Sequence, residues 1–413
     1  MLALMAEIRR LTTEDMPQFH RMHTVVYNQR KDYAENEEKN DEENEKKEKN
    51  ALENPPQWAW GAFEKGKFRA GMTEFDYLMR FDGNNVKMSG IGGVGTLPEA
   101  RKGGLIRQIF EKLLPEAYET GAIFSNLTPF SHDFYRMFGY EIACSRYELT
   151  VPAHYFQKLK PTGEFIQIFP GDDTAALQEV HSAYISGINH GICRDYWPDN
   201  RAWKQFTQSD PYSTGIFLYL WKDDAGKPQG YIKYEDIEDE EHAMSVKELA
   251  FTGREGLYGA LGLVGGLSAQ FKEFRWLMPA FIDPFDFVGE AWDIEPLIKP
   301  REMSRVINVK TALEKMRRPE GEGAYIVAVT DANLPVNTGK YLVEYAPEGT
   351  GVSPTTQEPH ISCDIRVLSQ LVTGYRTLEN ALRSRQTGLE VHGNRHILDR
   401  VFTQRPQHVT EYF

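Results

Sequence analysis

Apolar side chains recur every three or four residues between positions 105 and 120 of the chain. The residues on this stripe are Leu105, Ile106, Ile109, Phe110, Leu113 and Leu114. This spacing is that of one face of an amphipathic helix, and Thr120 followed by Gly121 is a suitable end for it. The pattern predicts a helix with one buried face.

Alternation of apolar and polar residues predicts strands on both sides of this helix. Within residues 1–152 the predicted strands are 7–11, 58–63, 71–81, 88–96, 122–127 and 140–151. Helices are predicted at residues 14–27, after a cap at Thr12 or Thr13, and after Ser131. Strands and crossover helices over about 150 residues are typical of one α/β domain.

The same order of elements returns in residues 153–303. A helix is predicted at 174–188, a strand pair at 215–221 and 229–236, and then a strand, a glycine turn and a helix over residues 246–264. The turn of this second unit, Arg254-Glu255-Gly256, is one residue shorter and carries an acid that would repel phosphate. We therefore predict a structural duplicate of the first unit that has lost its cofactor.

From about Ser304 the pattern changes again and predicts a third domain over residues 304–413. Its predicted strands are 305–309, 325–330, 340–345 and 361–365, and its predicted helices are 367–374 and 378–383. This mixture of strands and helices predicts an α+β domain.

Charge narrows the classes of partner. The net charge of −13 argues against a general nucleic-acid binder. It favours a cationic partner, or it reflects no more than a solvated acidic surface. Residues 31–50 carry nine acids and five bases, several of them four positions apart, which predicts a solvated helix or the edge of a lid.

Three cysteines that lie far apart in the chain, Cys144, Cys193 and Cys363, indicate a reducing compartment without a disulfide framework. We find no CxxC or HExxH motif, so we predict no metal site. The N-terminal apolar stretch is too short for a signal peptide. No apolar run is long enough to span a membrane, and we expect a cytoplasmic protein.

A basic glycine turn, Arg101-Lys102-Gly103-Gly104, precedes the helix that begins near Leu105. We expect these residues in its first turn. Basic side chains are unfavourable at the positive end of a helix dipole unless an anion offsets them, and free N–H groups at that end bind anions. The strand before the turn contains four glycines, at positions 90, 92, 93 and 95, which indicates a bulge or a close backbone approach. The alternative is a glycine-rich turn before an ordinary core helix.

Residues 101–106, RKGGLI, resemble the acetyl-CoA signature of the GNAT superfamily, (Gln/Arg)-x-x-Gly-x-(Gly/Ala), with Ile106 in place of the final small residue. That departure, together with FYRMFGYE at residues 134–141, resembles the enhanced intracellular survival (Eis) acetyltransferases. The resemblance implies tandem GNAT folds, the second degenerate, followed by a sterol-carrier-like domain. It also implies acetyl-CoA as cosubstrate, an aminoglycoside as precedent for the acceptor, and a hexamer.

The resemblance assigns the cofactor-binding residues by position. Backbone groups expected to hold the pantetheine arm and polarise the thioester carbonyl are those of Val94, Gly95 and Thr96. Residues expected to hold the pyrophosphate at the start of the helix are Arg101, Lys102, Gly103, Gly104, Leu105, Ile106 and Arg107. The residues expected at the thioester end are Phe130 and Ser131.

Two groups are expected to carry the chemistry. Tyr135 lies on the helix after the next strand, and a phenol with a pKa of about 10 is a suitable acid for a departing thiolate. Its alternative role is that of a core aromatic. The resemblance assigns the base to the terminal carboxylate of Phe413, whose alternative role is a hydrophobic anchor. Two terminal aromatic residues indicate that the chain end is docked, and nearby Glu411 would attract a cationic substrate.

The sequence therefore predicts an acetyl-CoA-dependent N-acetyltransferase that acts on a cationic small molecule, aminoglycoside-like or polyamine-like. Acetylation of protein lysine side chains is an alternative acceptor class. A further alternative is a protein that binds coenzyme A or an apolar ligand without catalysis.

Overall fold

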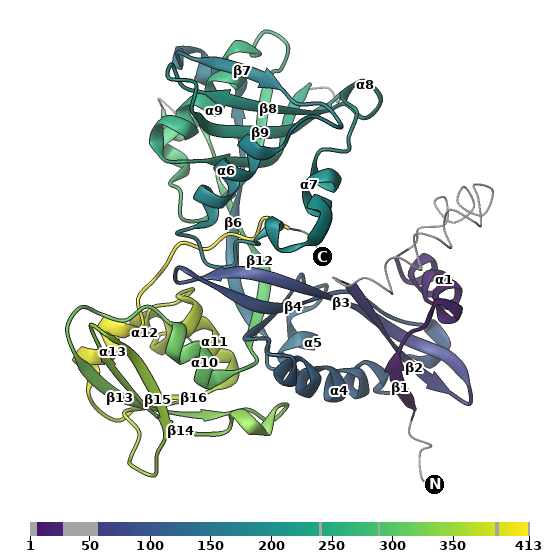
Figure 1. The fold of residues 1–413 in the computed structure, drawn as a ribbon, viewed down its shortest axis with the longest axis vertical. Helices are drawn as coiled ribbons and strands as arrows, with labels where there is room; N and C mark the ends of the chain where they lie inside the picture. Colours follow the sequence, from purple (N-terminus) through teal and green to yellow (C-terminus); the bar gives the residue numbers. More distant parts are fainter. Residues whose placement is uncertain (1–5, 28–56, 239–241, 288–289, 385–387, 412–413) are drawn as a thin grey trace.

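The computed structural model describes residues 6–27, 57–238, 242–287, 290–384 and 388–411. Within these residues the strands form one sheet of twelve and one sheet of five. Figure 1 shows three lobes that meet at a common centre. The helix predicted from the charges of residues 31–50 and the role assigned to Phe413 lie outside the described residues.

The first lobe forms one half of the larger sheet, in the order β1-β2-β3-β4-β5, with β12 and β6 next. Its elements are β1 (Glu7–Arg10), α1 (Met16–Tyr27), β2 (Gln57–Glu64), β3 (Lys67–Phe81), β4 (Asn84–Thr96), α4 (Leu105–Glu119), β5 (Phe124–Leu127), α5 (His132–Arg136) and β6 (Glu141–Pro152). The elements predicted in this region are confirmed, with shifted ends. Buried side chains of α4 and α1 belong to two separate cores, one on each face of the sheet.

The second lobe continues the same sheet in the order β6-β11-β10-β9-β8-β7. Its elements are β7 (Glu164–Gln167), α6 (Ala175–Ile185), α7 (Arg201–Phe206), α8 (Pro211–Thr214), β8 (Ile216–Lys222), β9 (Pro228–Ile237), β10 (Ala243–Phe251), α9 (Arg254–Gly266) and β11 (Glu273–Pro279). A parallel pair, β10 and β11, leads into and out of α9, as β4 and β5 do around α4. The predicted repeat of elements is therefore present.

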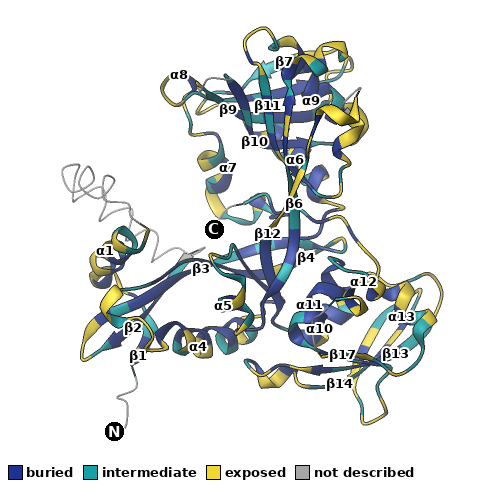
Figure 2. Ribbon diagram, turned by 180° about the vertical axis from the view of Figure 1, so that it is seen from behind, coloured by how far each residue is buried: buried dark blue, intermediate teal, exposed yellow. Residues whose placement is uncertain are grey.

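The third lobe holds the smaller sheet, in the order β15-β14-β13-β16-β17. Its elements are α10 (Val309–Lys315), β13 (Gly323–Thr330), β14 (Gly339–Ala346), β15 (Gly349–Pro354), β16 (Ile361–Asp364), α11 (Ile365–Thr373), α12 (Leu378–Leu382), β17 (Leu389–Val391) and α13 (Arg395–Val401). Its core is continuous with that beneath the β3–β4 hairpin of the first lobe. Figure 2 shows this junction as buried.

One strand joins the lobes. We predicted a strand at residues 305–309, but the structure has β12 at Leu297–Val306, and α10 begins at Val309. β12 lies between β5 and β6 and pairs with both in antiparallel sense. The boundary that we predicted at residue 304 therefore falls inside a strand of the larger sheet. Within the described residues, no helix is long and apolar enough to cross a membrane.

Candidate active site

The first lobe contains a split between two parallel strands. β4 and β5 pair only over residues 88–91 and 124–127, after which β5 ends and β4 continues. The register of β4 against β3 shifts between Gly92 and Gly95, and Gly93 has a φ of +55°. A Cβ on Gly93 would lie 2.6 Å from the His23 ring. The bulge and the close approach expected from the glycines are therefore both present.

Helix α1 packs against β4 at the split. The Tyr27 hydroxyl donates to the carbonyl of Val94 at 2.9 Å, and His23 Nε2 lies 3.0 Å from the carbonyl of Gly93. The sequence assigned the backbone of Val94 to the pantetheine arm, but its carbonyl already has this partner. Gly95 and Thr96 follow at the end of β4, and Gly95 lies against Met22 of α1. None of these α1 contacts was predicted, since pairing between a helix and a distant strand leaves no local pattern.

The basic turn before α4 is exposed and has an alternating backbone. Lys102 has a φ of +69° and Gly104 a φ of +71°, with Gly103 between them. Alternating conformations of this kind point successive N–H groups to one side and form an anion-binding nest. A Cβ on Gly104 would meet no atom within 4 Å, so the space above it is open. We expected Arg101 to Gly104 in the first helical turn, but α4 begins at Leu105 and Gly104 is its N-cap.

The side chains of the first turn of α4 divide between core and surface. Leu105 and Ile106 are buried in the core under the sheet. Their side chains anchor the helix, which leaves the unpaired N–H groups of its first turn at the basic turn. Arg107 is exposed and its guanidinium lies 3.9 Å from the sulfur of Met137, just beyond α5. The turn, α4 and α5 are thus adjacent.

Helix α5 begins as predicted. The Ser131 hydroxyl accepts a hydrogen bond from the amide of Phe134 at 3.4 Å and caps the helix. Phe130, just before it, is 69% exposed although it is a large apolar residue. Its ring lies 5.3 Å from that of Phe134 and 5.4 Å from that of Tyr135. An exposed aromatic side chain beside the split is available to contact a ligand.

Tyr135 is 2% exposed and lies among Phe130, Phe134 and Tyr140. Burial raises its pKa well above the ordinary value, and the neighbouring Tyr27 adds to this. The phenol therefore keeps its proton at neutral pH. Tyr135 thus packs as the core aromatic of the alternative interpretation. It also has a hydroxyl near Tyr27, the residue that donates to Val94 at the split.

The chain end is docked as far as the structure describes it. The amide of Asn189 donates to the carbonyl of Pro406 at 2.9 Å, and the amide of His408 donates to the carbonyl of Asn189 at 3.1 Å. Val409 is buried, and Glu411 is bonded to Arg194. In Figure 1 this segment runs from the third lobe into the space between the other two.

A cavity of about 510 Å³ lies where the chain end meets the first and second lobes. Its aromatic walls are Phe75, Tyr77, Trp197 and Phe206. Its charged walls are Arg194, Arg201, Lys233, Lys247, Glu248 and Glu411. Phe75 faces Gly90, next to the residue at which β4 and β5 part. The cavity therefore opens beside the split, and Glu411 is the one described residue of its wall to which the sequence had assigned a role.

The run of charged and aromatic residues between 194 and 206 is a further sequence signal for this cavity. Within the described part of the chain, no group of three or more His, Cys, Asp or Glu side chains is placed to hold a metal ion.

Comparison with known proteins bears on this site. Residues 7–143 match the family model of the acetyltransferase (GNAT) domain, and residues 309–410 match that of the sterol carrier protein domain. An uncharacterized N-acetyltransferase of Streptomyces avermitilis is 23% identical over 340 residues, which are 76% of this chain and 78% of that protein.

Solved structures share the fold over almost the whole chain. A probable N-acyltransferase from Enterococcus faecalis V583 is similar, with a TM-score of 0.83 at 20% identity over 99% of this chain and 100% of that one. Eis1 from Mycobacterium abscessus is similar, with a TM-score of 0.76 at 18% identity and the same coverage. These structures show the fold, and the domain match together with the Streptomyces relative supports an acetyl-transferring enzyme. A GNAT domain uses acetyl-CoA and acts on an amine acceptor.

Proposed function

We propose that the protein is an Eis-type N-acetyltransferase that moves the acetyl group of acetyl-CoA to an amine of a cationic small molecule. The observation that carries the proposal is the split between β4 and β5 beside the alternating turn at residues 101–104. A splayed strand accepts the amides of a pantetheine arm, and the turn accepts the pyrophosphate. The residues of the turn and of the α4 start fit this coenzyme because no side chain fills the space above Gly104.

The chemistry follows from the groups around the split. Acetyl-CoA supplies an activated thioester. The acceptor nitrogen, once it has lost its extra proton, attacks the carbonyl, and the carbon–sulfur bond then breaks. Tyr135, which is protonated at neutral pH, gives its proton to the sulfur that leaves. The terminal carboxylate of Phe413 takes the proton from the acceptor ammonium.

The docked chain end supports the role of the terminal carboxylate. Glu411 is fixed to Arg194 at 2.6 Å at the wall of the cavity. Two further residues span at most about 7 Å, so the carboxylate acts within that reach of Glu411. A free terminal carboxyl has a pKa of about 3.3–3.7, and it gains basicity only where burial disfavours its charge.

The acceptor is proposed to be a polyamine-like or aminoglycoside-like molecule. The net charge of −13 supports a cationic acceptor. The cavity wall does not add to this support, since Glu248 and Glu411 are both paired with Arg194. A cavity of about 510 Å³ between two lobes suits a small molecule better than a lysine on a folded protein. By resemblance we propose a hexamer in the cytoplasm. The three cysteines, which are all free thiols, are consistent with a reducing compartment.

The proposal is tested with Tyr135→Phe. We expect acetyl-CoA affinity, measured by calorimetry, to stay nearly unchanged, because the phenol does not hold the coenzyme. Thiol release with a panel of aminoglycosides, polyamines and lysine peptides should fall on the order of 100-fold or more, as for the loss of a general acid. Tight coenzyme binding without thiol release from any amine would favour a binding protein.

A second test concerns the chain end. A peptide tag fused after Phe413 moves the carboxylate away while the fold is kept. We expect the fused protein to bind acetyl-CoA and to lose most of its transfer activity. Full activity of the fusion, in a protein with an unchanged melting temperature, would rule out the terminal carboxylate as the base.

A further inference from the structure

The second lobe has a split of its own. β10 and β11 pair in parallel over residues 243–246 and 273–276 and then part, as β4 and β5 do after Ile91. The register of β10 against β9 shifts between Val246 and Glu248, as that of β4 shifts around Gly93. Glu248 therefore occupies, in the second lobe, the place just beyond the split where the first lobe has its glycine bulge.

A buried cation lies at this place. Arg194 is 5% exposed, and its guanidinium donates two hydrogen bonds to Glu248, at 2.6 and 2.9 Å. Its Nε donates to Glu411 at 2.6 Å, and its plane lies 4.3 Å from the centre of the Phe206 ring. A planar fork with three charge-assisted bonds fixes the direction of each partner as well as its distance.

The loop that carries Arg194 is held by the first lobe. The amide of Cys193 donates to the carbonyl of Leu78 at 2.8 Å, and the indole of Trp197 donates to the carbonyl of Asp76 at 3.0 Å. Both acceptors belong to β3, whose residue Phe75 lies beside the catalytic split. The loop of Arg194 is therefore fixed to β3, the strand next to β4, while Arg194 itself holds the last described residue of the chain.

We propose that Arg194 is a positioning residue for catalysis, which places the terminal carboxylate at the split by holding Glu411. This inference rests on the proposed role of Phe413 as the base. The second lobe, which has lost its cofactor turn, then serves as the receptor for the end of its own chain. Glu248 completes that receptor because it compensates the arginine and fixes its orientation.

A double-mutant cycle tests the proposal. The variants are Arg194→Met, removal of Phe413, and the two changes together. Misplacement of a reacting group by about 1 Å can cost on the order of 100-fold in rate, so we expect each single change to lower kcat by about that factor. The KM for acetyl-CoA should not change. If Arg194 acts through the chain end, the double variant is no slower than the slower single variant.

Glu411→Gln tests the same contact if Arg194→Met folds poorly, and Arg395→Met serves as the control. Glu411→Gln leaves Arg194 with one compensating carboxylate, Glu248, so the buried charges stay balanced. It should lower kcat while the melting temperature stays near that of the wild type. Arg395→Met breaks an exposed pair with Asp399 on α13 and should leave kcat unchanged.

The outcomes separate the two proposals. The positioning role would be overturned if the two single losses in kcat multiply in the double variant. It would also be overturned if kcat is unchanged in both Arg194→Met and Glu411→Gln. Removal of Phe413 shifts the terminal carboxylate back to Tyr412. Full activity of this variant would instead overturn the carboxylate of Phe413 as the base, and a loss in Arg194→Met would then reflect a structural role only.

Discussion

Glu302 is a carboxylate that the surrounding strands isolate from water. It lies on β12 opposite Cys144 of β6, it is 2% exposed, and both its oxygens are buried without a hydrogen-bond partner among the described residues. Burial raises its pKa to about 8, against an opposing effect of Arg301. Its isolation was invisible in the sequence, because the neighbouring strands lie more than 150 positions away.

We predict that this acid makes stability depend on pH. Below the ordinary pKa of 4.5 the carboxyl is protonated in both states. As the pH rises toward 8, the unfolded chain releases the proton first, so stability falls by about 1.4 kcal/mol per pH unit, to a total of roughly 4 to 5 kcal/mol. Glu302→Gln should remove this loss in urea unfolding measured between pH 5 and 8.

The control is Glu148→Gln on the adjacent strand β6. Lys299 holds the pKa of Glu148 below its ordinary value, so this variant should not flatten the profile. A Glu302→Gln profile that falls as steeply as that of the wild type would show that Glu302 is hydrated in solution.

At the scale of elements, α4 offers a matched pair of glycines. Gly104 before the helix has a φ of +71° and Gly121 after it a φ of +87°, and a Cβ at either position meets nothing within 4 Å. Alanine at each should therefore cost about 1 to 2 kcal/mol of stability through backbone strain alone. Only Gly104→Ala should weaken acetyl-CoA binding in calorimetry, because its Cβ would enter the open space at the proposed nest that the pyrophosphate is expected to fill.

Equal affinity in the two variants would mean that the turn does not bind the coenzyme. An affinity loss in Gly121→Ala as large as that in Gly104→Ala would point to helix stability rather than to the nest.

The elements that carry their own signal were predictable. The stripe from Leu105 to Leu114 predicted α4, and the glycines of β4 predicted its bulge. Both signals, helical periodicity and glycines that allow a positive φ, lie within a few neighbouring residues. The length and the place of β12 were not predictable. Pro300 and charged residues break its alternation, and its partners β5 and β6 precede it by most of a domain. The contact of Tyr27 with Val94 and the ion pairs of Arg194 were not predictable either, because their partners are distant in the sequence.

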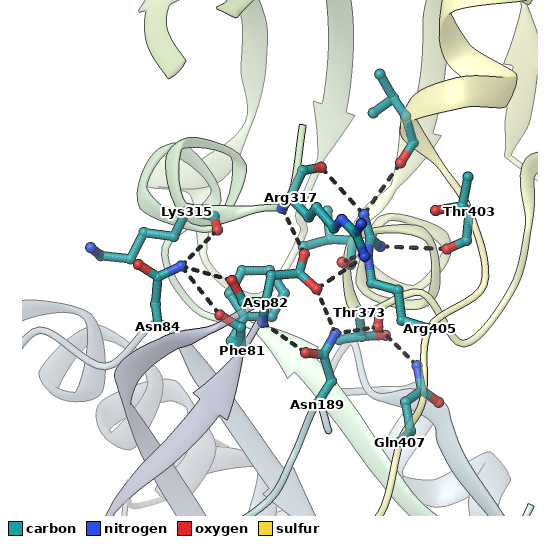
Figure 3. A network of polar contacts seen from close by, with 12 residues as sticks. Phe81, Asp82, Asn84, Asn189, Lys315, Arg317, Thr373, Thr403, Arg405 and Gln407 are labelled. Carbon is teal, nitrogen blue, oxygen red and sulfur yellow. Dashed lines mark hydrogen bonds and ion pairs between the residues drawn. The ribbon is translucent and has the colours of Figure 1, made fainter. Parts of the chain in front are cut away.

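At the scale of the molecule, the three lobes meet in a polar network around Asp82, at the turn between β3 and β4 (Figure 3). The Asp82 amide donates to the side chain of Asn189 at 2.7 Å, and the amide of Arg317 donates to the Asp82 carboxylate at 2.7 Å. Arg405 forms an ion pair with Asp82 at 3.2 Å, and Asn189 and Gln407 both donate to the carbonyl of Thr373 at 2.9 Å. One residue from the first lobe thus contacts the second, the third and the start of the chain end.

We predict that Asp82→Asn loosens the chain end as well as the junction. Burial lowers the pKa of Arg405, and Asp82 offsets this cost, so loss of the carboxylate leaves a buried cation with carbonyl partners only. Breaking a buried pair in this way costs about 3 to 5 kcal/mol, whereas replacing both partners with apolar residues is often neutral. Asp82→Leu with Arg405→Met should therefore recover much of the stability in urea unfolding.

Residues 406–411 follow Arg405 directly and lead to Glu411, so hydrogen exchange of this segment should accelerate in Asp82→Asn and transfer activity should fall. Acetyl-CoA affinity should hold, because the turn at residues 101–104 has no part in the network. Unchanged exchange in residues 406–411 despite a destabilised junction would show that Asn189 and Arg194 fix the chain end without help from the third lobe.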